Sequence, residues 1–160
     1  MDINFRKANV DDIDELVRMR ELFLEELSDE NYSKYDYRKE LSDYFEDAIL
    51  KESIIIYIAE SDNLIVGTSS MVIWKYPIGF SGIGKNGRGY ILNMYTAKAF
   101  RKKGIARTLL NKLVEKAIEL KLEKLHLHAT TAGTPLYESF GFKPPVYDEL
   151  EINLSQINKT

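Results

Sequence analysis

This 160-residue chain is organised around one stretch, Tyr90-Ile91-Leu92-Asn93-Met94-Tyr95-Thr96, which is followed closely by Arg101-Lys102-Lys103-Gly104-Ile105-Ala106. The first segment is rich in β-branched and aromatic residues, which predicts a strand. After Gly104, apolar residues recur at the spacing of one helix face, at Ile105, Leu109, Leu110, Leu113, Val114, Ala117 and Ile118. We therefore expect a strand, a short basic turn and a helix between residues 90 and 120.

The turn between this strand and this helix has the properties of an anion site. The first N–H groups of a helix have no intrahelical acceptor and lie at the positive end of the helix dipole. Gly104 carries no side chain, so a bulky anion can approach the backbone. The segment holds five basic residues and no acidic one: Lys98, Arg101, Lys102, Lys103 and Arg107. The pattern predicts a phosphate or pyrophosphate ligand.

The composition indicates a single domain over residues 1–160. This length suits one core, and 44% hydrophobic with 29% charged residues is ordinary for a globular protein. A net charge of −3 argues against general nucleic-acid binding. The chain lacks cysteine, which excludes disulfides, thiolate nucleophiles and cysteine-based zinc sites. No signal region or apolar run of membrane length occurs, so we expect a cytoplasmic monomer or homodimer with no membrane or nucleic-acid partner.

Periodicity and turn residues predict the other elements. Further strands are expected over residues 3–7, 54–59, 64–74, 124–129 and 146–154, with a turn at Asp62-Asn63 and a bulge at Gly67. Asn9 or Asp11 should cap a helix that buries Ile13, Leu16, Val17, Phe23, Leu24 and Leu27. A second helix, from about residue 37 to residue 50, should direct Leu41, Phe45, Ile49 and Leu50 inward. A short helix should begin with Thr134 as N-cap and Pro135 as first residue, and end at Gly141.

Two phosphate-binding patterns in the glycine-rich segment 76–89 lack their structural context. Gly82, Gly84 and Gly87 have the Gly-x-Gly-x-x-Gly spacing, but a strand follows them where a dinucleotide site needs a helix. Residues 79–86 nearly match a P-loop, but Asn86 replaces the Ser or Thr that would ligate Mg²⁺. We interpret the segment as a hairpin loop. His126 and His128 share one side of their strand without a nearby third ligand, so no metal site is expected.

The basic turn and a second segment together resemble a known family. Arg-x-x-Gly-x-Ala at 101–106, after a strand and before a helix, is similar to the pyrophosphate loop of the GCN5-related N-acetyltransferases (GNAT). Leu136-Tyr137-Glu138-Ser139-Phe140-Gly141-Phe142 resembles the Leu-Tyr-x-x-x-Gly-Phe element of the same family. The order and spacing of the two also fit. The resemblance covers the C-terminal two-fifths of the chain well and the rest loosely.

The resemblance implies an α/β (α+β) fold with a mixed, mostly antiparallel sheet of six to seven strands and about four flanking helices. The sheet would open between strands 90–96 and 124–129 to admit acetyl-coenzyme A (acetyl-CoA). Backbone groups of Met94, Tyr95 and Thr96 would then pair with the pantetheine arm, since unpaired strand edges still need partners. The pyrophosphate would be bound around Arg101, Lys102, Lys103, Gly104, Ile105, Ala106 and Arg107. Tyr137 takes the position of the family's general acid.

Two positions depart from the family pattern, and one catalytic group is missing. Thr130 occupies the place where an Asn often helps to hold the cofactor, and Gly133 stands where Ala is usual. Strand 90–96 carries no carboxylate, so the sequence offers no evident general base. Several residues remain conceivable for that role: Glu25, Glu26, Asp36, Glu60, His126 and His128.

The sequence therefore predicts an acetyl-CoA-dependent N-acetyltransferase that acts on a primary amine of a small molecule or peptide. The alternative is a catalytically weak CoA-binding sensor or structural module. A basic nucleic-acid or phosphate-binding protein is disfavoured by the net acidity. The tyrosine-rich segment 28–47, with Tyr32 and Tyr35, either packs as a peripheral helix or rims a pocket that prefers cationic acceptors.

Overall fold

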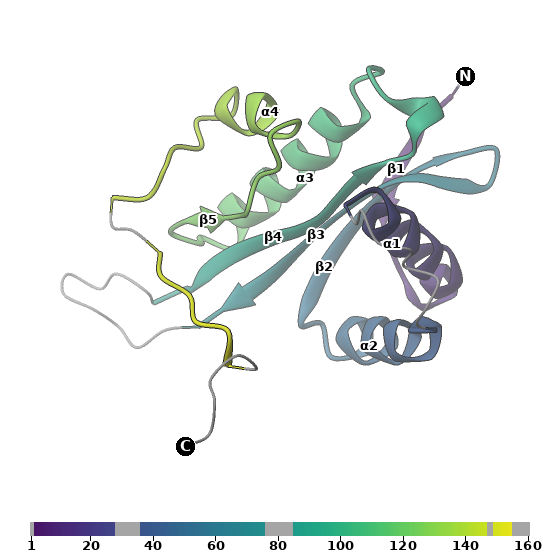
Figure 1. Ribbon diagram of the computed structural model, residues 1–160, viewed down its shortest axis with the longest axis horizontal. Coiled ribbons are helices and arrows are strands. Elements are labelled where there is room, and N and C mark those ends of the chain that lie inside the picture. Colours follow the sequence, from purple (N-terminus) through teal and green to yellow (C-terminus); the bar gives the residue numbers. More distant parts are fainter. Residues whose placement is uncertain (1, 28–35, 76–84, 147–148, 155–160) are drawn as a thin grey trace. The chain divides into compact units, whose positions relative to one another are not determined.

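The computed structural model describes residues 2–27, 36–75, 85–146 and 149–154 (Figure 1). Its contacts divide the chain into two compact units, Met1–His128 and Ala129–Thr160. The first unit contains β1 (Asn4–Lys7), η1 (Val10–Asp12), α1 (Ile13–Leu27), α2 (Arg38–Leu50), β2 (Ile54–Ser61), β3 (Leu64–Trp74), β4 (Arg88–Thr96), η4 (Lys98–Phe100), α3 (Ile105–Glu119) and β5 (Leu125–His126). The second contains α4 (Thr134–Glu138).

The sheet of the first unit has the strand order β1-β2-β3-β4-β5. The first four strands are antiparallel neighbours, and β4 pairs with β5 in parallel. The predicted mixed, mostly antiparallel sheet is thus confirmed, and the described residues contain four α-helices, as expected. The predicted number of six to seven strands is wrong, because the described residues form five.

The missing strand is the one expected over residues 146–154. Within the described part of that segment, no residue is in a strand. Val146 and Leu150 are about nine-tenths exposed, at 90% and 91%. Alternating apolar and polar residues give a strand one face that can be buried. A strand also needs a neighbouring strand to bond its backbone N–H and C=O groups. Alternation alone was therefore an insufficient reason to predict a strand here.

Helices α1 and α2 cover one face of the sheet, and α3 covers the other (Figure 1). Leu16, Val17 and Met19 of α1 pack with Phe45 and Ala48 of α2 against one face, which includes Ile54, Ile56, Ile58 and Tyr95. Ile105 and Leu109 of α3 pack with Ala59 and Val66 on the opposite face. The period-two alternation along β2 explains how one strand serves both layers.

The boundaries of α1, α2 and α3 and most of the buried positions match the sequence prediction. Three positions do not match, because Leu27, Leu50 and Ile118 are 54%, 67% and 70% exposed. Each lies at the C-terminal end of its helix, where the apolar stripe has run past the sheet that covers it. Met19 was not predicted to be buried, yet only 1% of its surface is exposed.

The predicted turn between β2 and β3 is present, and both Asp62 and Asn63 have positive φ, at 50° and 63°. Such a pair is typical of the tight hairpin turns that match strand twist. The expected bulge lies one residue from Gly67. Ala59 pairs with Gly67 and Glu60 with Ile65, which leaves Val66 as the extra residue. Gly67 has a packing role instead, since a Cβ there would lie 2.8 Å from Ile105 Cγ2.

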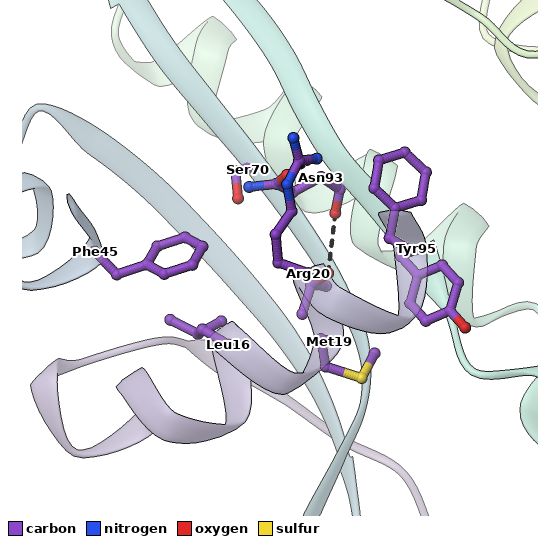
Figure 2. Close-up of a pocket in the computed structure, with 9 residues that line it drawn as sticks. Leu16, Met19, Arg20, Phe45, Ser70, Asn93 and Tyr95 are labelled. Atoms are coloured by element: carbon purple, nitrogen blue, oxygen red, sulfur yellow. Dashed lines mark hydrogen bonds between the residues drawn. The ribbon is translucent and has the colours of Figure 1, made fainter. Parts of the chain in front are cut away.

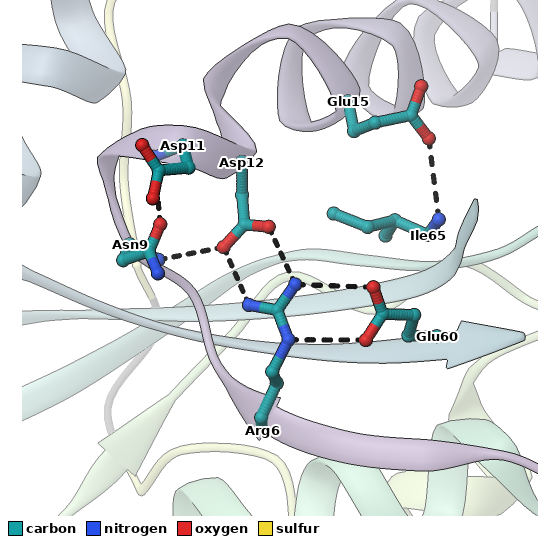
Figure 3. Close-up of polar contacts among 7 residues, drawn as sticks. All are labelled: Arg6, Asn9, Asp11, Asp12, Glu15, Glu60 and Ile65. Atoms are coloured by element: carbon teal, nitrogen blue, oxygen red, sulfur yellow. Dashed lines mark hydrogen bonds and ion pairs between the residues drawn. The ribbon is translucent and has the colours of Figure 1, made fainter. Parts of the chain in front are cut away.

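A polar cluster fixes the start of α1 to the edge of the sheet (Figure 3). The Arg6 guanidinium of β1 donates two hydrogen bonds of 2.8 Å to the Asp12 carboxylate and further bonds to Glu60. Asn9 caps η1 as predicted, because its side chain accepts from Asp11 N–H and its own N–H donates to Asp12. These bonds lower the pKa of Asp12, chiefly through Arg6. The cluster joins β1, η1 and β2.

Candidate active site

The turn between β4 and α3 has the backbone shape that the sequence suggested. Lys102 and Gly104 both adopt left-handed conformations, with φ of 60° and 79°. Gly104 is the N-cap of α3, and no side chain supplies a capping hydrogen bond there. The first bond of the helix runs from Thr108 N–H to the Gly104 carbonyl at 3.0 Å. The N–H groups that precede Thr108 in α3 have no acceptor within the helix, so they suit an anion.

The space in front of this turn is open. A Cβ built on Gly104 would meet no heavy atom within 4 Å. Arg101, Lys102, Lys103 and Arg107 are all exposed around it. Ile105, in contrast, is 2% exposed and packs with Leu109 in the α3 layer. The first turn of α3 is thus anchored on its apolar side while its N-terminal end faces solvent, and the residues present fit a pyrophosphate.

Arg101, predicted as a cofactor ligand, makes contacts with β4 and α1 in this structure. Its Nη2 donates to Glu26 on α1 at 2.5 Å, and its Nε donates to the Thr96 carbonyl at 2.9 Å. The guanidinium also lies over the ring of Tyr95, 5.6 Å from its centroid. These contacts tie the C-terminal end of α1 to the end of β4. Arg101 therefore holds the start of the turn in place.

Glu26 is the centre of this connection. Besides Arg101, it accepts a 2.6 Å hydrogen bond from the Tyr95 hydroxyl, and Lys98 lies 3.9 Å away. Burial, reinforced by the bond to Glu26, raises the pKa of Tyr95 to about 12. The hydrogen bonds and the cations lower the pKa of Glu26 despite its partial burial. Both groups keep fixed charge states near neutral pH, so neither is suited to exchange protons during a reaction.

Strand β4 offers an open edge next to this turn. Its pairing with β5 consists of Gly89 with Leu125 and Tyr90 with His126, so residues 91–96 have no strand neighbour on that side within the described chain. The predicted strand 124–129 is therefore shorter than expected. Met94, Tyr95 and Thr96 lie at the end of the open segment. The Tyr95 side chain belongs to the core under α1.

A bulge interrupts β4 within the open segment. Thr68 pairs with Tyr95 and Ser70 with Leu92, so Asn93 and Met94 together face Ser69 of β3. Asn93 has φ of 52°, and its carbonyl accepts a 2.9 Å bond from the Thr68 hydroxyl. Asparagine tolerates this left-handed conformation better than most residues. An Asn within a β-branched and aromatic run was the sequence feature from which the bulge could have been predicted.

In the second unit, the Leu-Tyr-x-x-x-Gly-Phe segment forms a Schellman motif, a helix ending closed by two reverse hydrogen bonds. Phe142 N–H donates to the Tyr137 carbonyl at 3.2 Å, and Gly141 N–H donates to the Glu138 carbonyl at 2.9 Å. Gly141 has φ of 90°, as this position requires. The rings of Tyr137 and Phe142 contact at 5.9 Å between centroids. Helix α4 itself ends at Glu138, earlier than predicted, and Gly141 closes the turn that follows it. Burial raises the pKa of the Tyr137 phenol.

The start of α4 corrects one prediction. Gly133 is the N-cap, and Thr134 is the first helical residue. The Thr134 hydroxyl donates back to the Thr130 carbonyl at 3.1 Å, and the Thr130 hydroxyl accepts from Gly133 N–H at 3.2 Å. Thr130 therefore supports the turn that precedes Tyr137. The helix thus begins at Thr134, one residue earlier than predicted, because the Thr134 hydroxyl bonds back to the preceding turn and does not cap the helix.

Comparison with known proteins decides the family. The acetyltransferase (GNAT) family model matches residues 16–142. The chain belongs to the GNAT family. An N-alpha-acetyltransferase of Saccharolobus solfataricus is 27% identical over 150 residues, covering 89% of this chain and 81% of that protein. A predicted acetyltransferase from Clostridium acetobutylicum, crystallised with acetyl-CoA, has 33% identity and a TM-score of 0.87, with 98% of this chain and 99% of that chain covered.

A GCN5-related N-acetyltransferase from Ralstonia eutropha JMP134 shares the fold, with a TM-score of 0.81 at 24% identity over 94% of this chain and 99% of that one. The resemblance seen in the sequence is thereby confirmed, together with N-acetyltransferase activity and the family's use of acetyl-CoA. No helix in the described residues combines the length and apolarity that crossing a membrane requires. Those residues also contain no cluster of three potential metal ligands.

An N-acetyltransferase needs a way to remove a proton from the acceptor amine, so the candidate general bases are compared by their contacts. At least four of the six candidates have a side-chain contact in the structure. Glu26 and Glu60 are held by arginines, and Asp36 accepts a bond from Arg38 N–H at the start of α2. His128 Nδ1 lies 2.5 Å from the Tyr90 hydroxyl, and Tyr90 stacks on Trp74. Tyr32 and Tyr35, expected at a pocket rim, lie outside the described residues.

Arg20, which no sequence pattern singled out, lines a cavity beside the β4 bulge (Figure 2). Its Nη1 donates to Asn93 Oδ1 at 2.7 Å. Arg20 lies four residues after Leu16 and three before Phe23, which places it on the inward side of α1. A charged residue within an apolar helix stripe was the feature that could have identified it.

Proposed function

We propose that this GNAT protein transfers an acetyl group from acetyl-CoA to a primary amine of a small molecule or peptide. The observation that carries the proposal is the open turn at Gly104, which places helix N–H groups without an intrahelical acceptor, together with exposed cations, directly after the open edge of β4. The Saccharolobus relative, by its name, acetylates an α-amine, which supports an amine as acceptor.

Each part of the chain then has a defined task. When bound, acetyl-CoA supplies the acetyl group as a thioester. Backbone groups of Met94, Tyr95 and Thr96 hold its pantetheine arm. The turn from Arg101 through Lys102, Lys103, Gly104, Ile105 and Ala106 to Arg107 binds the pyrophosphate, with the Arg101 side chain bracing the turn against Glu26. Thr130 supports the segment that carries Tyr137.

Tyr137 serves as the general acid. Because burial raises the pKa of its phenol, the Oη proton is retained at neutral pH. It can then be donated to the sulfur as negative charge develops there, which stabilises the transition state more than the ground state. The acceptor amine must first lose a proton, since an ordinary alkyl ammonium has a pKa of about 10.

A turnover screen tests this function. Purified protein and acetyl-CoA are mixed with amines of different classes, and release of the free CoA thiol is followed. We expect release that depends on an amine and on enzyme concentration. The alternative, a CoA-binding module of little activity, predicts that acetyl-CoA binds in calorimetry while no amine produces thiol above the uncatalysed rate.

A further inference from the structure

The Glu26 carboxylate, near the end of α1, connects segments that are far apart in the sequence. It accepts a 2.6 Å hydrogen bond from the Tyr95 hydroxyl of β4 and a 2.5 Å bond from Arg101 Nη2 at the start of the basic turn. The Lys98 ammonium of η4 lies 3.9 Å from the same carboxylate. The Glu26 side chain is 24% exposed, so these charged contacts are partly shielded from solvent. Glu26 thus fixes the end of α1 to both sides of the connection between β4 and α3.

The two hydrogen-bond partners of Glu26 belong to the two segments that we assign to acetyl-CoA. Tyr95 lies in the β4 edge for the pantetheine arm, and Arg101 begins the turn for the pyrophosphate. Between them the chain has only the three-residue helix η4, so side-chain contacts contribute to the relative position of edge and turn. Arg101 Nε also donates to the Thr96 carbonyl at 2.9 Å. One arginine and one carboxylate therefore hold the edge and the turn together.

A ligand that spans both segments needs them at a fixed separation. The pantetheine arm and the pyrophosphate of acetyl-CoA are covalently joined, so the β4 edge and the turn are occupied together. When a protein holds both parts of a site in place before binding, less conformational entropy is lost on binding and the affinity is higher. We propose that Glu26 is a positioning residue, which sets the affinity for acetyl-CoA through Tyr95 and Arg101 and not by contact with the cofactor. This inference deepens the proposed function and rests on its cofactor site.

The sign of the effect separates positioning from simple electrostatics. Glu26 carries a negative charge near a site for a polyanion, so Coulomb repulsion alone predicts that removing this charge tightens acetyl-CoA binding. Release of Arg101 for direct contact with the phosphates would act in the same direction. Positioning predicts the opposite, because the β4 edge and the turn lose the contact that holds them together.

Calorimetry of acetyl-CoA binding to folded Glu26→Gln measures this sign. Gln keeps the size of the side chain and one acceptor oxygen but loses the charge that holds Arg101. We expect Kd to rise about 10-fold, a factor that corresponds to one weakened charge-assisted hydrogen bond. Glu25→Gln is the matched control, because it removes the same charge one residue away and the Glu25 side chain makes no hydrogen bond or ion pair with any described residue. The Kd of this control should not rise.

A double-variant cycle assigns the effect to the Glu26–Arg101 pair. Arg101→Gln removes the same contact from the other side, so Glu26→Gln/Arg101→Gln should bind acetyl-CoA no more weakly than Arg101→Gln alone. Losses that simply add would show that the two residues act independently, against the inference. Glu26→Asp keeps the charge but withdraws the carboxylate by one methylene from Tyr95 and Arg101. It should also raise Kd, which keeps the inference testable if Glu26→Gln folds poorly.

Two further results would overturn the inference. One is unchanged or tighter acetyl-CoA binding by the folded Glu26 variants, with any loss confined to the unfolding temperature, which would make Glu26 a structural residue only. The other is an equal loss from Glu25→Gln. Where an amine is acetylated, Glu26→Gln should raise KM for acetyl-CoA and leave kcat nearly unchanged. If no amine releases thiol, the proposed transfer fails, whereas the Kd values still decide the role of Glu26.

Discussion

Tyr137 combines two roles at the scale of a single residue. Its carbonyl and ring close the Schellman motif with Phe142, while its hydroxyl is the proposed general acid. The first role depends on the backbone and the ring, and the second on one oxygen atom. Removing that oxygen should therefore separate structure from catalysis.

Tyr137→Phe should fold normally and bind acetyl-CoA nearly as well as wild type, but lose about 10²- to 10⁴-fold in kcat. Steady-state kinetics on the best acceptor measures the loss, and a rapid-mixing measurement of the transfer step shows whether chemistry limits turnover. Tyr44→Phe is the control, since Tyr44 is 45% exposed on α2 and should not affect kcat. Wild-type transfer in Tyr137→Phe would refute the general-acid assignment.

Contacts between distant residues are what the sequence could not predict at this scale. The basic turn was predicted correctly, but the pairing of Arg101 with Glu26 joins residues 75 positions apart. Basic residues near a phosphate loop are naturally interpreted as ligands. Whether a given basic side chain points toward the ligand or pairs within the protein depends on acidic residues of the neighbouring helix, such as Glu26 of α1. The local sequence of the turn does not contain that information.

At the scale of elements, the position of α3 depends on Gly67. A Cβ at this residue would lie 2.8 Å from Ile105 Cγ2 and 3.1 Å from Leu109 Cδ1. Ile105 is also the first residue of α3, so any displacement there is transmitted directly to the Gly104 turn. The glycine thus couples sheet packing to the geometry of the proposed cofactor site.

Gly67→Ala should destabilise the protein by about 1–3 kcal/mol through overpacking. Urea denaturation measures the change in the free energy of unfolding. The double variant Gly67→Ala/Ile105→Ala removes the closest contact, so its loss should be smaller than the sum of the two single losses. If the double variant lost as much free energy of unfolding as the two single variants together, the close approach of α3 to Gly67 would carry no strain.

The Arg6–Asp12 pair predicts how stability responds to pH. Asp12→Asn should lower the free energy of unfolding at neutral pH by about 1.5–3 kcal/mol, because it weakens two charged hydrogen bonds of a buried carboxylate. Arg6 lowers the pKa of folded Asp12 below its ordinary 3.8. The carboxylate's contribution is therefore complete above pH 3.8 and is lost as the pH falls through the lower folded-state pKa.

The difference between wild type and Asp12→Asn should accordingly stay constant around neutral pH and shrink only in acid. Chemical denaturation over a pH series measures it. Asp43→Asn provides the control, because Asp43 pairs with Lys39 at an exposed site where ion pairs contribute at most about 1 kcal/mol. A difference that grew on acidification would contradict the assigned pairing.

Helices and turns with a strong local sequence pattern were predictable, whereas the pairing of strands was not. The α1, α2 and α3 boundaries follow from apolar stripes and capping residues, and the β2–β3 turn from Asp62-Asn63. Segment 146–154 shows the opposite case, since its alternation was real but its described residues pair with no strand. Strand formation requires a neighbour, which the sequence of the segment does not contain.

At the scale of the whole molecule, two short motifs were sufficient to predict the family, because each has a distinct backbone function. The Gly104 turn opens a helix for an anion, and Gly141 closes a Schellman motif. The contact of Arg20 with Asn93 was not predictable in the same way, because it joins α1 and β4 across 73 positions. Motifs thus predicted the cofactor, whereas contacts between distant elements depend on the tertiary fold.

The most direct test of the central claim measures acetyl-CoA binding to three proteins by calorimetry: wild type, Gly104→Ala and Gly104→Glu. Both substitutions carry the strain of a left-handed residue, about 1–2 kcal/mol, and the open space beyond Gly104 accommodates either side chain. If the pyrophosphate binds at this turn, Gly104→Ala should retain most of the affinity, whereas Gly104→Glu should lose it because a carboxylate would face the phosphates. Unchanged affinity in a folded Gly104→Glu protein would contradict the account.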